Sequence, residues 1–358
     1  MIIILTQCFP TKVGGIETLM YDIASYLSIK HDVKVLADQQ DTYKDLKFDK
    51  NNKNFSIFRF KGLKFFRKRK KFKQLKKICS VNKIDVVITD SWKSLEKPIK
   101  FLKEKKIPII SLVHGNEIII KNNKHKNRIK KILELTSAVI LNSNYTKNLL
   151  TKISKSLKRI EVIYPGVKPT NNILEQKIDL NNGFPTLLTL ARLEKRKGHA
   201  LILKSIFNLK KIYPDIQYII AGNGDQLENI KNEIKKYNLE TSVKLVGTIN
   251  ESQKKFIFNK TDIMIMPTLD ETHSNSIEGF GIAYIEAAQY GINAKSIPLN
   301  LFPSFLIIWV LSLITSIKMT NRQPWWVRKE NLNHIISLLN KIRSSTISLI
   351  HSWVLNPE

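Results

Sequence analysis

Cysteine is nearly absent from this chain of 358 residues, which contains only Cys8 and Cys79. The two lie far apart and in no metal-ligand spacing, which favours a reducing compartment and argues against a zinc site. A secretory signal is also missing, because the apolar run from Met1 to Leu5 is too short and has no basic segment before it. The first residues instead predict a buried parallel strand, and we expect a cytoplasmic protein.

Acidic residues are scarce as well: 30 Asp and Glu stand against 59 Lys and Arg, for a net charge of +29. Part of this excess follows from a composition rich in Lys, Asn and Ile. Residues 61–77, however, hold ten Lys or Arg and no acid, interleaved with Phe and Leu. Such a segment suits an anionic membrane surface, where each basic residue contributes about 1 kcal/mol. A solvated face and a nucleic-acid surface are the alternatives; no recognition module accompanies the segment, so we expect no nucleic-acid partner.

The last glycine of the sequence is Gly291 and the last aspartate is Asp270, whereas four of the five tryptophans lie beyond Gly291. The stretch from Ser296 to Ile317 carries no charge and just meets the minimum length of a transmembrane helix. Its Asn, Pro, Ser and Thr residues make insertion marginal. We favour a non-native tail from a shifted reading frame, ahead of a membrane-associating hairpin or anchor and of a buried core helix.

The length predicts two domains, because one hydrophobic core rarely serves so many residues. Strand-like apolar runs alternate with segments of helical period, which indicates parallel sheets with crossover helices. Residues 164–183, rich in Pro, Gly and Asn, predict a linker between the halves. The predicted strands are 2–5, 33–36, 86–88, 109–113, 138–142 and 162–163, then 186–190, 218–221, 243–246 and 263–266.

The most informative motif runs from Ser276 to Ala288, with Glu278 and Glu286 eight positions apart. In a helix this spacing is a little over two turns, so both carboxylates would point to nearly the same side. Gly279 and Gly281 would let the first turn approach a ligand closely. The pattern suits a polyhydroxylated ligand; a buried amphipathic helix with two incidental acids is the alternative.

Five segments, in order, resemble the retaining family 4 glycosyltransferases (glycosyl transferases group 1). Each segment is weakly specific alone, but five in order across about 290 residues are strongly specific. The segments are the opening strand with the Gly14-Gly15 loop, the Arg-x4-Lys-Gly element from Arg192 to Gly198, the strand-end loops Gly222 to Asp225 and Val246-Gly247, and the glutamate-seven-glutamate motif.

The resemblance implies an α/β fold of two Rossmann-like, doubly wound domains that face a cleft, the GT-B arrangement. We expect an N-terminal acceptor-side domain over residues 1–168, a linker over 169–184, a nucleotide-sugar-binding domain over 185–292 and a divergent tail over 293–358. The implied activity moves a hexose, with retained anomeric configuration, from a nucleotide diphosphate sugar to a glycan or lipid-linked acceptor at the cytoplasmic membrane face.

A diphosphate donor needs cations and backbone N–H groups. Arg192 and Lys197, five positions apart after a predicted strand, can converge on the diphosphate leaving group; an ordinary basic turn is the alternative. In the family this pair replaces a metal, and no Asp-x-Asp sequence occurs here, so we expect no cofactor and no metal. Gly14 and Gly15 follow the first strand, where bare backbone can approach phosphate or acceptor unless they form a plain turn.

The other site residues are carried over from the resemblance. His114 would contact the transferring sugar, unless it is merely structural. Glu278 would bind hydroxyls of the donor sugar, and Glu286 would bind the ribose. Backbone amides at a helix start would come from Gly279, Phe280, Gly281 and Ile282, and the base would be bordered by Gly222, Gly224, Val246 and Gly247.

The resemblance stops after Ile292. Related enzymes continue with an apolar strand and a Gly-Gly-x-x-Glu loop whose amides hold the donor phosphates, and no glycine is available here to build that loop. We therefore expect an incomplete second domain, without its last strand and with weak donor binding. The alternative function is a catalytically inactive remnant or binding protein that has lost the donor phosphate loop.

Overall fold

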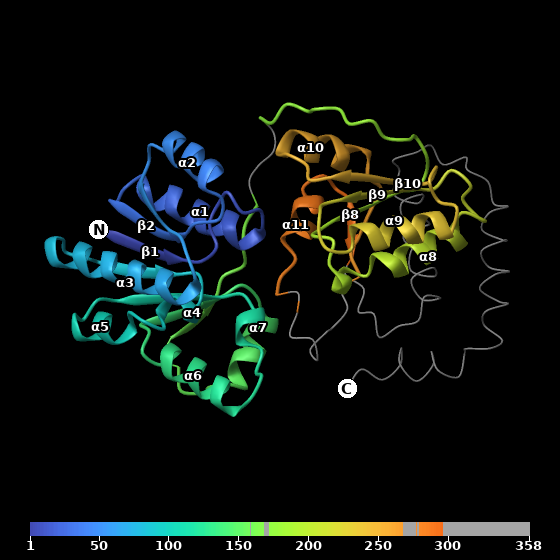
Figure 1. Cartoon of the computed structure of the whole chain (residues 1–358). Helices are drawn as coiled ribbons and strands as arrows, with labels where there is room; N and C mark the ends of the chain where they lie inside the picture. The colour runs from blue at the N-terminus through green and yellow to red at the C-terminus, as the bar shows by residue number, and fades with distance from the viewer. Residues whose placement is uncertain (158, 168–171, 268–276, 278, 296–358) are drawn as a thin grey trace. The chain divides into compact units, whose positions relative to one another are not determined.

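The computed structural model describes residues 1–157, 159–167, 172–267, 277 and 279–295 (Figure 1). Within these residues the chain forms two parallel sheets with helices between successive strands. Both sheets belong to the same compact unit. The predicted α/β class is confirmed, because the alternation of apolar strands and amphipathic helices produces two Rossmann-like sheets in series.

The first sheet has seven parallel strands in the order β3-β2-β1-β4-β5-β6-β7. All five residues of β1 are buried, as expected for an Ile- and Leu-rich strand covered on both faces. Its Ile2 pairs with Val33 on one side and Val86 on the other. The strands are β1 (Ile2–Thr6), β2 (Val33–Asp38), β3 (Ser56–Phe60), β4 (Val86–Thr89), β5 (Ile109–Val113), β6 (Ala138–Leu141) and β7 (Ile160–Val162).

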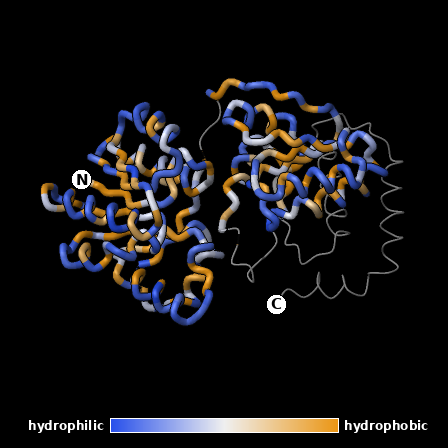
Figure 2. Tube along the Cα trace, viewed as in Figure 1, coloured by the Kyte–Doolittle hydropathy of each residue, from blue (hydrophilic) through white to orange (hydrophobic). Residues whose placement is uncertain are grey.

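Helices cover both faces of this sheet. One hydrophobic core includes Met20 and Ala24 of the first helix, and the other includes Leu75 and Ile78 of the third. Figure 2 shows hydrophobic residues gathered along the strands and hydrophilic ones along the outer helix faces. The helices are α1 (Gly15–Ser28), α2 (Thr42–Asn51), α3 (Lys64–Val81), α4 (Trp92–Leu95), α5 (Ile99–Glu104), η1 (Asn116–Ile118), α6 (Asn123–Leu133) and α7 (Asn144–Thr151).

The second sheet has five parallel strands in the order β10-β9-β8-β11-β12. Residues 163–167 and 172–185, which lead to it, form no helix or strand, as expected of a linker. Its strands are β8 (Thr186–Leu190), β9 (Gln217–Ala221), β10 (Val243–Gly247), β11 (Ile263–Ile265) and β12 (Asn293–Lys295). Its helices are η2 (Lys195–Lys197), α8 (His199–Leu209), α9 (Leu227–Lys236), α10 (Glu251–Lys260) and α11 (Ile282–Ala288).

Two strands were not predicted from the sequence. β3 is an edge strand with partly exposed residues, so it lacks the continuous apolar run of a buried parallel strand. β12 pairs with β11, from Ile263 opposite Asn293 to Ile265 opposite Lys295. A strand therefore forms directly after position 292, where its loss was expected. The predicted tail features from residue 296 onward lie outside the described residues.

The expected single helix with both glutamates is also wrong. Helix α11 begins only at Ile282, whereas Ile277 and residues 279–281 are not helical. Gly281 has φ 83° and ψ 60°, a left-handed conformation that ends any helix before it. Glu286 lies on α11, and Glu278 lies outside the described residues.

The basic segment at residues 61–77 forms most of α3, and its side chains do not all face solvent. Lys71 is buried against the sheet, whereas Leu63, Phe65 and Phe66 are 76%, 49% and 55% exposed. One lysine of the segment therefore faces the sheet, and the residues at the start of α3 expose apolar side chains to solvent.

Among the helices of the described residues, none combines the length and the apolar character that crossing a membrane requires.

Candidate functional site

The loop after β8 carries both predicted phosphate-binding cations, in different surroundings. The Arg192 side chain is 62% exposed, and its Nη2 lies 2.8 Å from Oε1 of Glu194. Lys197 is buried at the end of η2, with its Nζ 3.3 Å from the Sδ of Met266, directly after β11. Gly198 then adopts φ 67°, which allows the chain to turn into α8. Arg192 faces solvent and Lys197 faces the sheet end, and their joint action on a diphosphate stays a prediction.

A buried polar chain lies beside Lys197. The Nδ1 of His199 is 3.4 Å from the hydroxyl of Tyr218, which is 2.8 Å from the Oγ1 of Thr189. Burial, with a smaller contribution from the positive charge of Lys197, lowers the pKa of His199 to about 4. The ring is therefore neutral at pH 7 and adds no second cation beside Lys197.

Two glycines hold the loops after β8 and β9 together. A Cβ on Gly222 would lie 1.9 Å from the carbonyl oxygen of Ala191, and a Cβ on Gly224 would lie 2.4 Å from that of Leu193. Gly222 also has φ 140° and donates its N–H to the carbonyl of Gly247 at 2.7 Å. These contacts fix the Arg192 loop against the strand ends of the second sheet.

Val246 is half-buried and packs against the hydrophobic core of the second sheet, and Gly247 follows it with φ 68°. A Cβ on Gly247 would meet no atom within 4 Å. This glycine is therefore required by its backbone angle and not by a close neighbour. A nucleotide base beside Val246 and Gly247 stays a prediction.

The segment around Gly279 lies directly against loops of the first sheet. A Cβ on Gly279 would be 1.9 Å from the carbonyl oxygen of His114. The hydroxyl of Ser143 donates to the carbonyl of Gly279 at 2.7 Å, and the N–H of Ile277 donates to Oδ1 of Asn116 at 2.6 Å. The structure therefore brings together two predicted site residues that are far apart in the sequence.

His114 directly follows β5, and one nitrogen of its ring is buried. Its backbone N–H donates to Oε1 of Glu117 at 2.6 Å, which holds the turn after the strand. Its Nε2 is buried and has no hydrogen-bond partner among the described residues. A buried polar atom without a partner is costly, so a ligand hydroxyl at this position would be favoured.

Four further predicted residues lie near this contact. The Phe280 ring stacks on Tyr164 with centroids 5.8 Å apart, a role for its side chain that the sequence did not reveal. A Cβ on Gly15 would be 3.1 Å from the Cδ1 of Ile282, so the start of α1 is close to the start of α11. Gly281 precedes Ile282 as the N-cap of α11.

Gly14 is the N-cap of α1, and a carboxylate already lies beside it. A Cβ on Gly14 would be 2.3 Å from Oε2 of Glu17, which is buried and pairs with Lys12 at 3.1 Å. The Lys12–Glu17 ion pair therefore lies next to this loop, and its contact with phosphate or acceptor stays a prediction.

Glu286, the predicted ribose ligand, is held by a lysine. Its Oε1 lies 2.6 Å from Nζ of Lys254 on α10, which also pairs with Glu251 at 2.8 Å. Burial lowers the pKa of Lys254, but the two carboxylates outweigh burial and the pKa is raised. The pair leaves Oε2 of Glu286 as an acceptor whose direction is set by Lys254.

Sequence reasoning missed Asn116, Ser143 and Lys254. Asn116 and Ser143 follow the carboxyl ends of β5 and β6, and polar residues at such positions were the available signal. Lys254 lies in an ordinary polar helix and gave no signal.

Among the side chains that the structure describes, no group of three or more His, Cys, Asp or Glu is placed to hold a metal ion.

Two family models match adjacent parts of this chain. Glycosyltransferase Family 4 matches residues 13–171, and Glycosyl transferases group 1 matches residues 171–298. The alpha-monoglucosyldiacylglycerol synthase of Streptococcus pneumoniae is 23% identical over 241 residues, which are 62% of this chain and 53% of that protein. The chain spans about half or less of the length of the first curated relatives that it matches.

Solved structures agree with the two-sheet architecture. Sucrose-phosphate synthase from Thermosynechococcus elongatus is 15% identical, with a TM-score of 0.73 and 98% of each chain covered. HepE of Anabaena in complex with UDP-glucose is 15% identical, with a TM-score of 0.62, 96% of this chain and 99% of that chain covered. At these identities the likeness concerns the fold alone, and it confirms the predicted GT-B class.

The two glycosyltransferase models together match residues 13–298, and these residues contain both parallel sheets. The chain belongs to the glycosyltransferase family that these models describe.

Proposed function

We propose that this chain is a retaining glycosyltransferase that moves a hexose from a nucleotide diphosphate sugar to a glycan or lipid-linked acceptor. The observation that carries the proposal is the approach of Gly279 to the carbonyl of His114, at a distance that excludes any side chain. The backbone of His114 therefore lies beside Gly279, and the Nε2 of the same residue is buried without a hydrogen-bond partner among the described residues. A sugar hydroxyl bound there would contact one residue from each sheet.

The chemistry assigns one role to each group. Arg192 and Lys197 stabilise negative charge on the departing diphosphate, the position at which electrostatic stabilisation accelerates the reaction most. The bond from the anomeric carbon to the diphosphate oxygen breaks, and a bond to the acceptor oxygen forms on the same face of the sugar. The acceptor hydroxyl proton passes to the departing phosphate oxygen. Because side-chain cations and no metal ion are proposed to neutralise the diphosphate, we expect turnover to be unchanged by a metal chelator.

The name of one relative supports a lipid acceptor, and we propose that the chain acts at the cytoplasmic membrane face. HepE is described in complex with UDP-glucose, and the Streptococcus pneumoniae relative is named as an alpha-monoglucosyldiacylglycerol synthase. In this chain the exposed Leu63, Phe65 and Phe66 at the start of α3 adjoin many basic residues. Such a surface suits peripheral contact with anionic lipid.

The test is a pair of lysine variants in η2. Lys197→Ala should reduce turnover by about 10²-fold or more, the cost of removing one donor that stabilises transition-state charge. Lys195→Ala, two residues earlier in the same turn, is the matched control and should retain turnover. Transferase activity that survives Lys197→Ala would contradict the assigned role.

A second candidate, a binding protein or inactive remnant, is favoured by the lack of glycine after Gly291. A loop that wraps a phosphate closely needs glycine where backbone amides must point inward. Calorimetry with UDP separates the two candidates, since tight binding supports the enzyme and no binding supports the remnant. In the second case, a family-like continuation grafted after Ile292 should restore UDP binding.

A further inference from the structure

A pocket lies at the carboxyl ends of β1 and β2, beside α3 and α4. The order of the first sheet reverses between β1 and β4, because β1 to β3 extend one way and β4 to β7 the other. In doubly wound sheets, ligands bind outside the carboxyl ends of the strands at such a switch point. Four of the eleven lining residues are lysines, namely Lys68 and Lys71 from α3, Lys93 from α4 and Lys97 after it, and the apolar Leu5, Phe72, Leu75 and Pro98 form much of the remaining lining.

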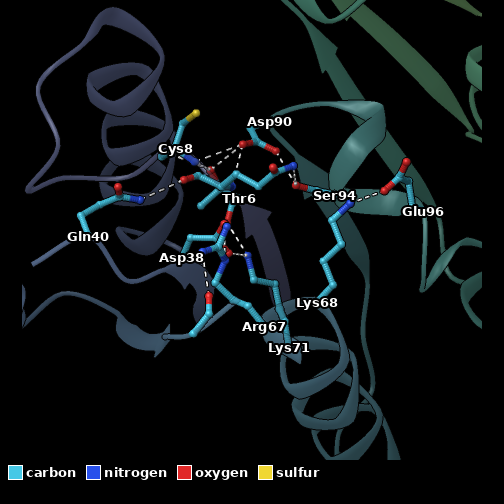
Figure 3. Close-up of polar contacts among 12 residues, drawn as sticks. Thr6, Cys8, Asp38, Gln40, Arg67, Lys68, Lys71, Asp90, Ser94 and Glu96 are labelled. Atoms are coloured by element: carbon cyan, nitrogen blue, oxygen red, sulfur yellow. Dashed lines mark hydrogen bonds and ion pairs between the residues drawn. The ribbon is translucent and has the colours of Figure 1, made fainter. Parts of the chain in front are cut away.

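Asp38, at the end of β2, is the acid of this lining, and it pairs with two cations (Figure 3). Its carboxylate oxygens lie 2.7 Å from Nζ of Lys71 and 2.9 Å from Nε of Arg67. Lys71 also donates to the carbonyl of Thr6 at 2.6 Å. Burial lowers the pKa of Lys71, although Asp38 opposes that shift. The single carboxylate of Asp38 thus faces two cations, Lys71 and Arg67.

Glu96, after α4, also pairs with two cations. It contacts Nζ of Lys68, and its Oε1 lies 2.5 Å from Nη2 of Arg128. A third acid, Asp90 at the end of β4, accepts from the hydroxyl of Ser94 at 2.7 Å and from backbone N–H groups that follow β1. Four cations thus pair with Asp38 and Glu96, and Asp90 adds a third carboxylate to this region.

Lys93 and Lys97 add two further charges, and neither forms an ion pair with a carboxylate in the part of the chain that the structure describes. Nζ of Lys97 lies 5.3 Å from the ring centroid of Phe65, at the exposed start of α3. Phe72 and Pro98 give the pocket an apolar wall. An excess of ammonium groups beside apolar surface suits a compact anion that carries an apolar or sugar group.

We propose that this pocket is an anion site that binds a phosphate ester of the acceptor. A phosphate ester brings up to two negative charges and three acceptor oxygens, which matches Lys93 and Lys97. The assignment to the acceptor rests on the proposed transferase function. The donor diphosphate is expected on the other sheet, where Arg192 and Lys197 lie, so the two sites are tested independently.

Glycerol 3-phosphate is the soluble probe, titrated by calorimetry into the full chain. The double variant Lys93→Ala plus Lys97→Ala should weaken its binding by about tenfold or more, because hydrogen bonds to charged groups are lost. The control Lys47→Ala plus Lys50→Ala removes the same charge from exposed positions on α2 and should bind normally. Phosphatidylcholine vesicles with and without phosphatidic acid form the second arm, and UDP is titrated into every variant.

Binding of both probes that depends on Lys93 and Lys97 supports a phosphate-ester site. Binding of phosphatidic acid vesicles alone, with the same dependence, assigns the ester to a lipid headgroup. Equal binding by the double variant, an equal loss in the control, or no binding of either probe overturns the proposal. If the protein binds UDP but neither phosphate probe, the result contradicts this anion site only. If it binds the phosphate probes but not UDP, the result contradicts the donor site only. If the double variant melts early, Lys97→Gln alone repeats the comparison at one exposed position.

Discussion

Gly222→Ala should destabilise the second sheet and displace the loop that carries Arg192. The new Cβ would lie 1.9 Å from the carbonyl oxygen of Ala191, so the two loops must separate by about 1.5 Å to reach an ordinary contact. Overpacking of this kind costs about 1–3 kcal/mol, and the φ of 140° adds about 1–2 kcal/mol for a residue with a Cβ. The expected loss is about 2–5 kcal/mol.

Gly247→Ala is the matched control. It has φ 68° and no neighbour within 4 Å of the new Cβ, so it bears only the backbone cost of about 1 kcal/mol. The difference between the two variants therefore isolates the close approach of the loops after β8 and β9.

Amide hydrogen exchange of β8 and β9 measures the free energy of opening of this sheet in each variant. Gly222→Ala should accelerate exchange of these strands far more than Gly247→Ala, and UDP affinity should fall about tenfold or more with the displaced loop. Equal exchange in the two variants would refute the argument from close approach, whatever the effect on UDP binding.

Three further predictions follow from the described contacts. Lys254→Met should raise the KM for the donor about tenfold with kcat retained, because Glu286 loses the lysine that orients it; Lys260→Met on the same helix is the control, and an unchanged KM would contradict the role. The folded-state pKa of His199, about 4, lies below its usual 6.5, so the free energy of unfolding is unaffected by this group above pH 6.5 and should fall by about 3 kcal/mol as pH drops to 4. His199→Phe should reduce the fall in melting temperature across this pH range, and an unchanged fall would count against the prediction. Phe65→Ser plus Phe66→Ser should weaken sedimentation with anionic vesicles about tenfold or more, whereas Tyr43→Ser plus Leu46→Ser, also exposed, should not; equal binding to neutral and anionic vesicles would leave only a solvated face.

Much of the fold could be predicted locally, because buried parallel strands are continuous apolar runs. β5 and β8 lie at the predicted residues 109–113 and 186–190. The edge strand β3 and the three-residue β12 could not be predicted, because each owes its conformation to a neighbouring strand and not to its own composition.

The chemical types at the site were also visible in the sequence. Arg192 and Lys197 stand after β8, and Gly222 and Gly224 stand after β9, as the motifs indicated. Glycine after an apolar strand allows backbone angles that other residues rarely adopt, so a tight loop at the strand end can be predicted there without tertiary contacts.

Tertiary structure alone decided how these residues meet. Gly279 must be a glycine because the carbonyl of His114 lies against it, and Glu286 is oriented by Lys254 from another helix. The start of α11 at Ile282, after the left-handed Gly281, separated the two glutamates that a single helix would have aligned. Contacts between residues far apart in the chain depend on the packing of whole elements, and no local pattern carries that information.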